Sequence, residues 1–328
     1  MTKGLVTIFG GSGFIGRYAA RQLVKAGWQV RIACRRPGIA GDVRLAGSPG
    51  WIDLVQANVR NRASIARAID GADAVINLVG ILHEGGRQSF DASQAEGAQS
   101  VAELAAEAGI TRFVQVSAIG ANPDSKSKYA RTKAQAEERV RAAIPGAVIL
   151  RPSIVFGPED NFFNRFASMT RMSPFLPAIG GGKTRFQPVY AGDVADAIAA
   201  AVSSDEVQGK TYELGGPGTY TFKEIYDFVL ETVCRKRFKL PLPFLFAKPV
   251  GLLFGAVFRY IPPVRWVFGP PPITGDQVEL LKTDNVVGEE VLGLADLGVT
   301  QLESIEAIVP TYLWRHRPYG EFTEPGKA

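Results

Sequence analysis

Cysteine and histidine are both scarce, with two of each among the 328 residues of the chain. Cys34 and Cys234 lie far apart, and this spacing suggests neither a disulfide framework nor a metal cluster. No grouping of histidine, cysteine and carboxylate residues has the spacing of a metal site. We therefore expect a protein of a reducing cytoplasm that binds no metal.

Long hydrophobic runs are missing as well. A helix that spans a bilayer needs roughly 18 or more apolar residues, and no uninterrupted run reaches that length. The first apolar run, residues 5–9, is too short for a signal peptide, and the Arg- and Ser-rich amphipathic leader of mitochondrial import is lacking. Zinc-finger, RNA-recognition and basic-zipper patterns are lacking too, so we expect no nucleic-acid partner.

The composition is that of a soluble globular protein, with 46% hydrophobic and 21% charged residues. The net charge of +5 is unevenly placed, because a dense basic run at 235–239 precedes an apolar stretch at 240–266. This stretch has three interpretations. It forms the core of a small lobe, or it contacts an anionic membrane surface through 235–266, or it docks on a protein partner.

The most informative segment is a glycine-rich turn near the N-terminus. A buried strand at 5–9 runs directly into Gly10-Gly11-Ser12-Gly13-Phe14-Ile15-Gly16, and an amphipathic helix follows. Glycines let a backbone approach phosphate groups closely, and the first turn of a helix offers free N–H groups at the positive end of its dipole. The pattern predicts the pyrophosphate site of a dinucleotide-binding fold.

A second strand, expected at 28–34, ends in Arg35 and Arg36. A fold that selects NAD carries Asp or Glu at this point to bind the ribose 2′-hydroxyl. Two arginines without a neighbouring carboxylate suit a 2′-phosphate, so NADP(H) is favoured over NAD(H). The alternative is that the two arginines only end the strand in solvent.

Short apolar runs alternate with amphipathic segments as far as residue 150. Further strands are expected at 51–56, 74–78, 113–117 and 147–150, and helices at 14–26, 62–69, 89–108 and 129–143. This alternation is typical of an α/β fold of the Rossmann type, a doubly wound parallel sheet with helices on both faces. The carboxyl ends of its strands line one crevice, where ligands bind.

Prolines, phenylalanines and glycine clusters become frequent after Arg151. We expect an NADP(H)-binding domain over 1–150, with 184–203 returning to it as strand and helix. Residues 151–183 and 204–328 are expected to form a smaller, mostly helical C-terminal lobe that faces substrate or partner. Near its end, residues 315–317 are interpreted as a solvated basic tail.

A second constellation follows the strand expected at 113–117. Ser117 ends this strand, and Tyr129 and Lys133 stand four residues apart on the next helix. This spacing places the phenol and the ammonium group on one face, where a lysine can activate a tyrosine as general acid or base for carbonyl–alcohol chemistry beside a nicotinamide. Ser117 would hold the substrate oxygen. The same spacing also occurs on solvated helix faces, and Arg151 is expected to orient backbone or a carboxylate beneath the site.

These motifs, together with residues 77–80, 151–158 and 188–195, resemble the extended short-chain dehydrogenase/reductase superfamily. Residues 156–169, 187–190, 241–246 and 315–317 are more specific. They are similar to the nucleotide-binding accessory subunit of respiratory complex I, the family of its thirty-nine-kilodalton subunit. This resemblance covers nearly the whole chain.

The resemblance implies NADPH held in the crevice, usually without turnover, by a subunit that supports assembly and stability. The implied partners are complex I subunits of the peripheral arm near the membrane and the quinone site. The implied location is peripheral, on the cytoplasmic side of the bacterial inner membrane. If the protein is active, the implied catalytic residues are Ser117, Tyr129 and Lys133.

The cofactor-binding residues follow from the same motifs and the resemblance. They are Gly10, Gly11, Ser12, Gly13, Phe14, Ile15, Gly16, Arg35, Arg36, Asn58, Val59, Leu78, Val79, Gly80, Tyr129, Lys133, Pro152 and Ile154. Asn58 departs from the family pattern, because many relatives carry there an aspartate that contacts the adenine.

Two other functions stay open at this point. The chain could be an active NADPH-dependent reductase or epimerase/dehydratase, soluble in the cytoplasm, that acts on a sugar nucleotide, an isoprenoid or a quinone-related carbonyl. It could also be a redox-sensing regulator that reports NADPH supply to a partner.

Overall fold

The structure is a computed structural model that describes residues 2–82, 84–85, 88–249, 251–252 and 274–322. His83, and residues 250 and 253–266 of the apolar stretch, lie outside the described residues. The chain forms two compact units. Unit 1 comprises Met1–Pro152, Ala191–Leu214 and Val287–Gln301, and unit 2 comprises Ser153–Tyr190, Gly215–Val286 and Leu302–Ala328.

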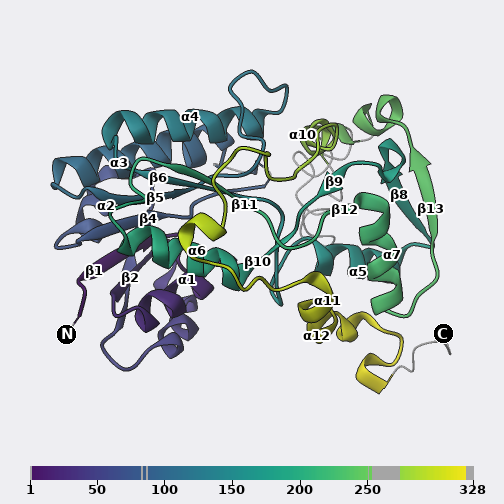
Figure 1. Ribbon diagram of the computed structural model, residues 1–328, viewed down its shortest axis with the longest axis horizontal. Helices are drawn as coiled ribbons and strands as arrows, with labels where there is room; N and C mark the ends of the chain where they lie inside the picture. The colour runs from purple at the N-terminus through teal and green to yellow at the C-terminus, as the bar shows by residue number, and fades with distance from the viewer. Residues whose placement is uncertain (1, 83, 86–87, 250, 253–273, 323–328) are drawn as a thin grey trace. The chain divides into compact units, whose positions relative to one another are not determined.

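Unit 1 is built on a seven-stranded sheet in the order β11-β6-β5-β4-β1-β2-β3 (Figure 1). Every pair of neighbouring strands is parallel, which confirms the predicted Rossmann-type α/β fold. The strands are β1 (Leu5–Phe9), β2 (Gln29–Cys34), β3 (Ile52–Gln56), β4 (Ala74–Asn77), β5 (Arg112–Val116), β6 (Val148–Pro152) and β11 (Thr211–Leu214).

Helices cover both faces of the sheet (Figure 1). On one face lie α2 (Arg62–Ile69), α3 (Glu96–Glu107) and α4 (Lys128–Ala143), whose apolar sides share one core with the strands. On the other face, α1 (Phe14–Lys25) packs against α6 (Ala191–Ser203). The inner strands are therefore buried on both sides, as in other doubly wound folds, and their largely apolar sequences follow from that burial, whereas the edge strand β3 is only partly buried.

The order of the strands fixes the position of the ligand crevice. β1 pairs with β2 on one side and with β4 on the other, so the direction of winding reverses between β1 and β4. In open α/β sheets this reversal separates the loops that follow the two strands and leaves room for a ligand. The glycine turn follows β1, and Leu78, Val79 and Gly80 follow β4.

One predicted helix has a different form in the structure. The segment expected as a single helix at 89–108 begins with a π-helical turn, Asp91–Ala95, and continues as α3. π-Helical turns are rare and occur often at functional sites. This turn lies next to α4, which carries Tyr129 and Lys133.

In the described part of unit 2, short strands pair two by two. β7 (Val155–Phe156) pairs with β10 (Val189–Tyr190), β8 (Phe175–Ile179) with β13 (Phe238–Leu242), and β9 (Arg185–Phe186) with β12 (Tyr220–Thr221). The helices include α5 (Phe163–Met172), α7 (Phe222–Thr232), α10 (Gly275–Leu280), α11 (Ile305–Ile308) and α12 (Pro310–Leu313).

Aromatic side chains form the core of unit 2. The ring centroids of Phe166 and Tyr226 are 5.0 Å apart at a steep angle, and those of Phe222 and Tyr226 are 4.6 Å apart. Such tilted and edge-to-face pairs stabilise a core beyond their buried area. The phenylalanines that become frequent after Arg151 in the sequence thus gather in one cluster.

The boundaries of the units differ from the ranges expected for the lobes. In the segment expected to return at 184–203, strand β10 pairs with β7 inside unit 2, whereas α6 belongs to unit 1. The strand that joins the main sheet is β11, at Thr211–Leu214, where no strand was predicted. Its four residues include Thr211 and Glu213, so they do not form an apolar run in the sequence.

The apolar stretch is only partly described, and its described part is largely exposed. Leu240, Leu245 and Phe246 are 54%, 78% and 61% exposed, whereas Ala247 is buried with Ile179 and Val278, so the stretch contributes to the core of unit 2 only in part. Within the described residues, no helix combines the length and the apolar character needed to cross a bilayer. Those residues also contain no group of three or more His, Cys, Asp or Glu side chains that could hold a metal ion.

Candidate functional site

The glycine turn is packed so closely that side chains are excluded from it. A Cβ atom on Gly16 would lie 2.5 Å from the Cα of Gly11, and one on Gly11 would lie 2.6 Å from the Cδ1 of Ile32. Gly10 has a φ of +80°, and its Cβ would be 3.2 Å from the carbonyl carbon of Leu78. The turn is therefore packed between α1, β2 and the loop after β4, and no side chain covers the backbone at its glycines.

The first turn of α1 carries no group that would compete with an anion. Gly13 is the N-cap residue and makes no side-chain cap, and no acidic residue lies in the first turn. The N–H groups of the next residues, Phe14 and Ile15, therefore keep no intrahelical acceptor. Ser12 lies in the turn itself, where its carbonyl accepts from the Nε of Arg17 at 3.3 Å. Bare backbone and uncapped N–H groups fit a pyrophosphate.

The loop after β4 is fixed by a buried amide pair. Asn77 donates from Nδ2 to Oε1 of Gln115 at 2.9 Å, and its Oδ1 accepts from the N–H of Val79 at 3.1 Å. Leu78 and Val79 lie beside Gly10, and a Cβ on Gly80 would be 3.4 Å from the Nζ of Lys133. The loop thus connects the glycine turn with the residues of α4.

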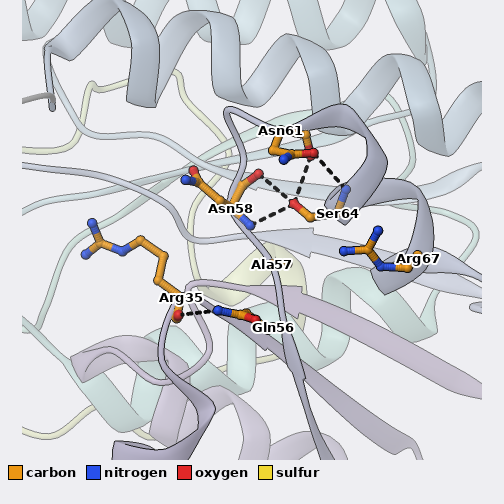
Figure 2. A pocket seen from close by; sticks show the side chains of 7 residues that line it. All are labelled: Arg35, Gln56, Ala57, Asn58, Asn61, Ser64 and Arg67. Carbon is orange, nitrogen blue, oxygen red and sulfur yellow. Dashed lines mark hydrogen bonds between the residues drawn. The ribbon is translucent and has the colours of Figure 1, made fainter.

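A pocket of about 330 Å³ opens at the ends of β2 and β3 (Figure 2). Its lining contains Arg35 and Arg67 with Asn58 and Ser64 between them, and no acidic residue. Asn58 is held by its N–H, which donates to Oγ of Ser64 at 3.0 Å. The pocket also includes Gln56, Ala57 and Asn61. Two cations without a carboxylate suit a phosphate group.

Two predicted cofactor residues lie away from the lining of this pocket. Arg36 is exposed beside it, and Val59 is buried in the core, where it meets α3 at Gly97. Arg67, on α2, was not predicted. The spacing from Arg35 to Arg67 carries no local signal, because only the packing of α2 on the sheet brings them together.

Ser117 and Lys133 are both buried where β5 meets α4. Lys133 is 5% exposed and donates from Nζ to the carbonyl of Val116 at 3.2 Å, and its Nζ lies 5.9 Å from the ring centroid of Tyr129. Burial lowers the pKa of Lys133 to about 8, although the carboxylate of Glu137 acts in the opposite direction. Oγ of Ser117 is buried and has no hydrogen-bond partner among the described residues.

The unpartnered hydroxyl of Ser117, like the glycine turn, fits a bound nicotinamide dinucleotide and its substrate. A buried polar atom without a partner is costly unless a ligand or water satisfies it. Tyr129 is half-buried, and its ring packs edge-on against Phe90 at 5.9 Å. The structure thus gathers Ser117, Tyr129 and Lys133 at one end of the crevice, near Gly80.

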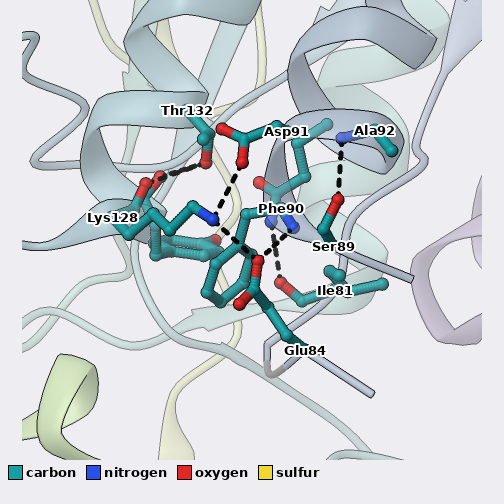
Figure 3. Close-up of polar contacts among 10 residues, drawn as sticks. Ile81, Glu84, Ser89, Phe90, Asp91, Ala92, Lys128 and Thr132 are labelled. Atoms are coloured by element: carbon teal, nitrogen blue, oxygen red, sulfur yellow. Dashed lines mark hydrogen bonds and ion pairs between the residues drawn. The ribbon is translucent and has the colours of Figure 1, made fainter. Parts of the chain in front are cut away.

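A polar cluster at the start of α4 supports Tyr129 and was not predicted (Figure 3). Nζ of Lys128 contacts Oε1 of Glu84 at 3.0 Å and Oδ2 of Asp91 at 2.8 Å. Glu84 also accepts from the N–H of Phe90 at 2.9 Å. Both carboxylates raise the pKa of Lys128, with Asp91 as the stronger cause. The cluster ties the segment before the π-helical turn to α4.

A second polar cluster lies beside Lys133 and is centred on Arg151, which binds a carboxylate there as expected. Its guanidinium binds both oxygens of Glu137, at 3.0 and 2.7 Å, and contacts Glu213 on β11 at 3.5 Å. The two carboxylates raise the pKa of Arg151, Glu137 being the first cause. Glu137 stands one helical turn after Lys133 on α4, so Arg151 holds the residue that acts on the lysine.

The last two predicted residues fall in different units. Pro152 ends β6 in unit 1, where its carbonyl accepts from the N–H of Ile119 at 3.0 Å. Ile154 belongs to unit 2, packs against the aromatic core and accepts from the N–H of Val189 at 2.9 Å. Their role in cofactor binding stays a prediction, as does that of every site residue above.

Comparison with known proteins places this arrangement in a family. A family model described as the NAD dependent epimerase/dehydratase family matches residues 6–215, well over half of the chain. The chain belongs to this family. The match ends just after β11, so it covers all strands of the main sheet.

Within this family the chain is similar to mitochondrial proteins named NADH dehydrogenase [ubiquinone] 1 alpha subcomplex subunit 9. It is 37% identical to the Arabidopsis thaliana protein over 297 residues, which cover 89% of this chain and 73% of the relative. It is 34% identical to the Mus musculus protein over 336 aligned residues, with 99% and 85% covered. The resemblance stated from the sequence is thereby confirmed.

Among solved structures, the fold is similar to a crystal structure of NADPH-dependent quinone oxidoreductase from Escherichia coli complexed with NADPH. The TM-score is 0.72 at 17% identity, and 94% of this chain and 99% of that chain are covered. At this identity the likeness shows the fold alone. A fold shared within the epimerase/dehydratase family does not by itself fix the function.

Proposed function

We propose that the protein is an accessory or assembly subunit associated with respiratory complex I, NADH:quinone oxidoreductase, and that it holds NADPH mainly as a structural ligand. The observation that carries this proposal is the similarity to the subunit 9 proteins over 89–99% of the chain. It extends beyond residue 215, where the family model ends. We further propose a place on the peripheral arm near the membrane and the quinone site, at the cytoplasmic face of a bacterial inner membrane.

Each part of the crevice suits one part of a nicotinamide dinucleotide. The uncapped start of α1 and the bare glycine turn would bind the pyrophosphate. Ser117, Tyr129 and Lys133 would surround the nicotinamide end. The pocket with Arg35 and Arg67 would take the adenosine end, where two guanidinium groups and no carboxylate favour a 2′-phosphate.

A structural role for the nucleotide follows from mass action. A ligand that binds only the folded chain stabilises it by about 2.7 kcal/mol at a hundred times its Kd. In this chain the ligand would join the turn after β1, the loop after β4 and the pocket beyond β2. NADPH is therefore expected to raise the thermal midpoint of unit 1 and to protect the glycine turn from hydrogen exchange.

The choice of NADPH over NADH is tested with the two strand-end arginines. Arg35→Ala with Arg36→Ala should weaken NADPH binding by at least tenfold and NADH binding by less than twofold, because only NADPH carries the 2′-phosphate. Arg67→Gln should act in the same direction. Arg21→Ala, which removes an exposed charge from α1, serves as the control and should change neither affinity. Equal losses for both nucleotides would contradict the assignment.

Association with complex I is tested separately. The tagged chain is expected to copurify with complex I subunits from solubilised membranes, and deleting its gene should lower the amount of assembled complex. Absence of these subunits from every preparation would refute the proposal. The rival function, an active NADPH-dependent reductase, is tested through Ser117, Tyr129 and Lys133, which the chain retains. If Tyr129→Phe abolished a measurable reductase turnover and left NADPH binding intact, the protein would be an enzyme.

A further inference from the structure

Three segments of unit 2 that are distant in sequence meet around His316. The Nε of Arg235 donates to the carbonyl of His316 at 3.2 Å. The Nε of Arg317 donates to the carbonyl of Thr232 at 2.8 Å, and the Nε of Arg237 donates to that of Thr170 at 2.8 Å. The C-terminal ends of α5 and α7 are thereby joined to the turn Trp314–His316. Of the solvated tail predicted at 315–317, Arg315 is exposed as expected, whereas His316 and Arg317 are half-buried and bonded to the chain at the end of α7.

The chain after α7 is directed into this region by its backbone. Cys234 has a φ of +53°, a conformation that glycine usually provides at the end of a helix. The N–H of Arg235 donates to the carbonyl of Leu230 at 3.0 Å, and that of Cys234 donates to Glu231 at 3.0 Å. This pair of bonds is the Schellman motif, and it fixes the reversal that presents Arg235 and the basic residues after it.

Positive charge gathers here, and the described residues give it no carboxylate partner in an ion pair. Arg171, Arg235, Arg237, Arg315 and Arg317 form no ion pair with a carboxylate among the described residues. Arginines elsewhere in the chain do form such pairs, as Arg62 does with Glu103 and Arg185 with Asp284. Other arginines, such as Arg31 and Arg131, also lack an ion pair among the described residues, so what sets this group apart is that Arg171, Arg235 and Arg237 lie close enough to act on one another.

The charges are close enough to act on one another. Burial lowers the pKa of Arg235, and the neighbouring Arg237 and Arg171 lower it further. Burial also lowers the pKa of His316, and Arg315, Arg171 and Arg235 add to the effect. The Nδ1 of His316 is buried and has no hydrogen-bond partner among the described residues. Repulsion and an unsatisfied nitrogen both raise the free energy of the ligand-free state.

We propose that Arg171, Arg235, Arg237 and His316 form a binding site for a phosphate group. A phosphate carries close to two negative charges and several strong acceptor oxygens, which suit terminal guanidinium N–H groups. Arg235 uses only its Nε for the backbone of His316, so its two terminal nitrogens face no acceptor among the described residues. A bound phosphate would relieve the repulsion, and its oxygens or a water beside them would satisfy the histidine.

The surroundings of the site suit a phosphate carried by a lipid headgroup as well as a free one. Met172 follows Arg171 and is 73% exposed, and Phe238 follows Arg237 and is 74% exposed. Phe175, which pairs with Phe238 across β8 and β13, is 53% exposed. Apolar side chains next to cations are typical of surfaces that bind anionic lipid.

The binding of phosphate is followed through the NMR signals of the His316 ring. The chain has two histidines, so the variant His83→Gln assigns the ring signals of His316 in an NMR spectrum. Adding inorganic phosphate to the full chain should shift these signals in a saturable way and raise the pKa of His316. Arg171→Gln should weaken the binding of phosphate by about tenfold, which is about 1.4 kcal/mol. Arg171 is exposed and its charge is not used in an ion pair, so this variant should fold normally.

The control is Arg185→Gln, which removes one charge from another exposed position of unit 2, together with its ion pair to Asp284, and should leave phosphate binding unchanged. Equal weakening by both variants, or equal shifts with chloride, would overturn the proposal. So would the absence of a saturable shift.

Vesicles of phosphatidylcholine with and without phosphatidic acid then distinguish the two sources. Binding only to the acidic vesicles, lost in Arg171→Gln, identifies a lipid headgroup. Binding of inorganic phosphate without vesicle binding identifies a free phosphate ligand, and both results support the site. Stronger binding of a polyglutamate peptide than of either phosphate source would overturn it.

Discussion

The close packing of Gly16 on Gly11 gives the most direct test of the nucleotide site. In Gly16→Ala the new Cβ would lie 2.5 Å from the Cα of Gly11 and 2.6 Å from its carbonyl carbon and oxygen. Carbon atoms in proteins pack at about 3.5–4.0 Å, so the turn and α1 must separate by roughly 1 Å. The contact is with backbone, and therefore no side-chain rotation can relieve it.

Two opposing effects set the expected stability of this variant. Overpacking of this kind costs about 1–3 kcal/mol, whereas replacing glycine by alanine inside a helix contributes about 1 kcal/mol of stability. We expect a net loss of about 1–2 kcal/mol, seen as a fall in Tm of roughly 2–6 °C. Gly146→Ala is the control, because a Cβ at Gly146 meets nothing within 4 Å. It should leave Tm and nucleotide binding unchanged.

The larger effect of Gly16→Ala should fall on nucleotide binding. A hydrogen bond to a charged group contributes about 1.5–3 kcal/mol, and a 1 Å displacement of the turn would lose at least one such bond to the pyrophosphate. NADPH affinity should therefore fall by at least tenfold, measured by isothermal titration. An affinity within twofold of the native value, together with an unchanged Tm, would refute the assignment of the turn to the pyrophosphate.

Two further predictions concern the buried charges beside Tyr129. Between about pH 8 and pH 10 the unfolded chain keeps a proton on Lys133 that the folded chain has lost, so the free energy of unfolding should rise with pH there, by up to about 3 kcal/mol. Urea titrations of the native chain and of Lys133→Met should show this rise only in the former, and identical pH profiles would contradict it. Arg151→Ala leaves the carboxylates of Glu137 and Glu213 buried without their partner, and should destabilise unit 1 by about 3–5 kcal/mol. Arg62→Ala, which breaks only exposed ion pairs, should cost at most about 1 kcal/mol, and equal losses would mean that the Arg151 cluster is not effectively buried.

Much of the fold could be predicted because its elements carry local signals. Most of the strands from β1 to β6 are buried on both faces and appear in the sequence as short apolar runs, whereas the edge strand β3 is buried mainly at Ile52. The helices α1 and α2 begin at their predicted residues because the glycine turn and Asn61 mark their N-terminal ends. β11 was missed because Thr211 and Glu213 interrupt its apolar pattern. Its place at the edge of the sheet depends on pairing with β6, which is remote in sequence.

The candidate site was only partly predictable for the same reason. Ser117, Tyr129 and Lys133 follow spacing rules that hold within one strand and one helix, so the sequence could point to them. Arg67 and Lys128 have no such rule. Arg67 reaches the pocket of Arg35 only because α2 packs on the sheet, and Lys128 joins Glu84 and Asp91 only because the π-helical turn lies beside α4.

The sequence by itself determined the parallel sheet, the glycine turn after its first strand and the family, because these depend on residues that are neighbours along the chain. Tertiary structure alone decided which charges are paired. It gave Arg151 two carboxylates and placed Arg171, Arg235 and Arg315 near His316, where they form no ion pair with a carboxylate among the described residues. The physical reason is that burial and electrostatic energy depend on distances in space, and these arise only when remote segments pack together.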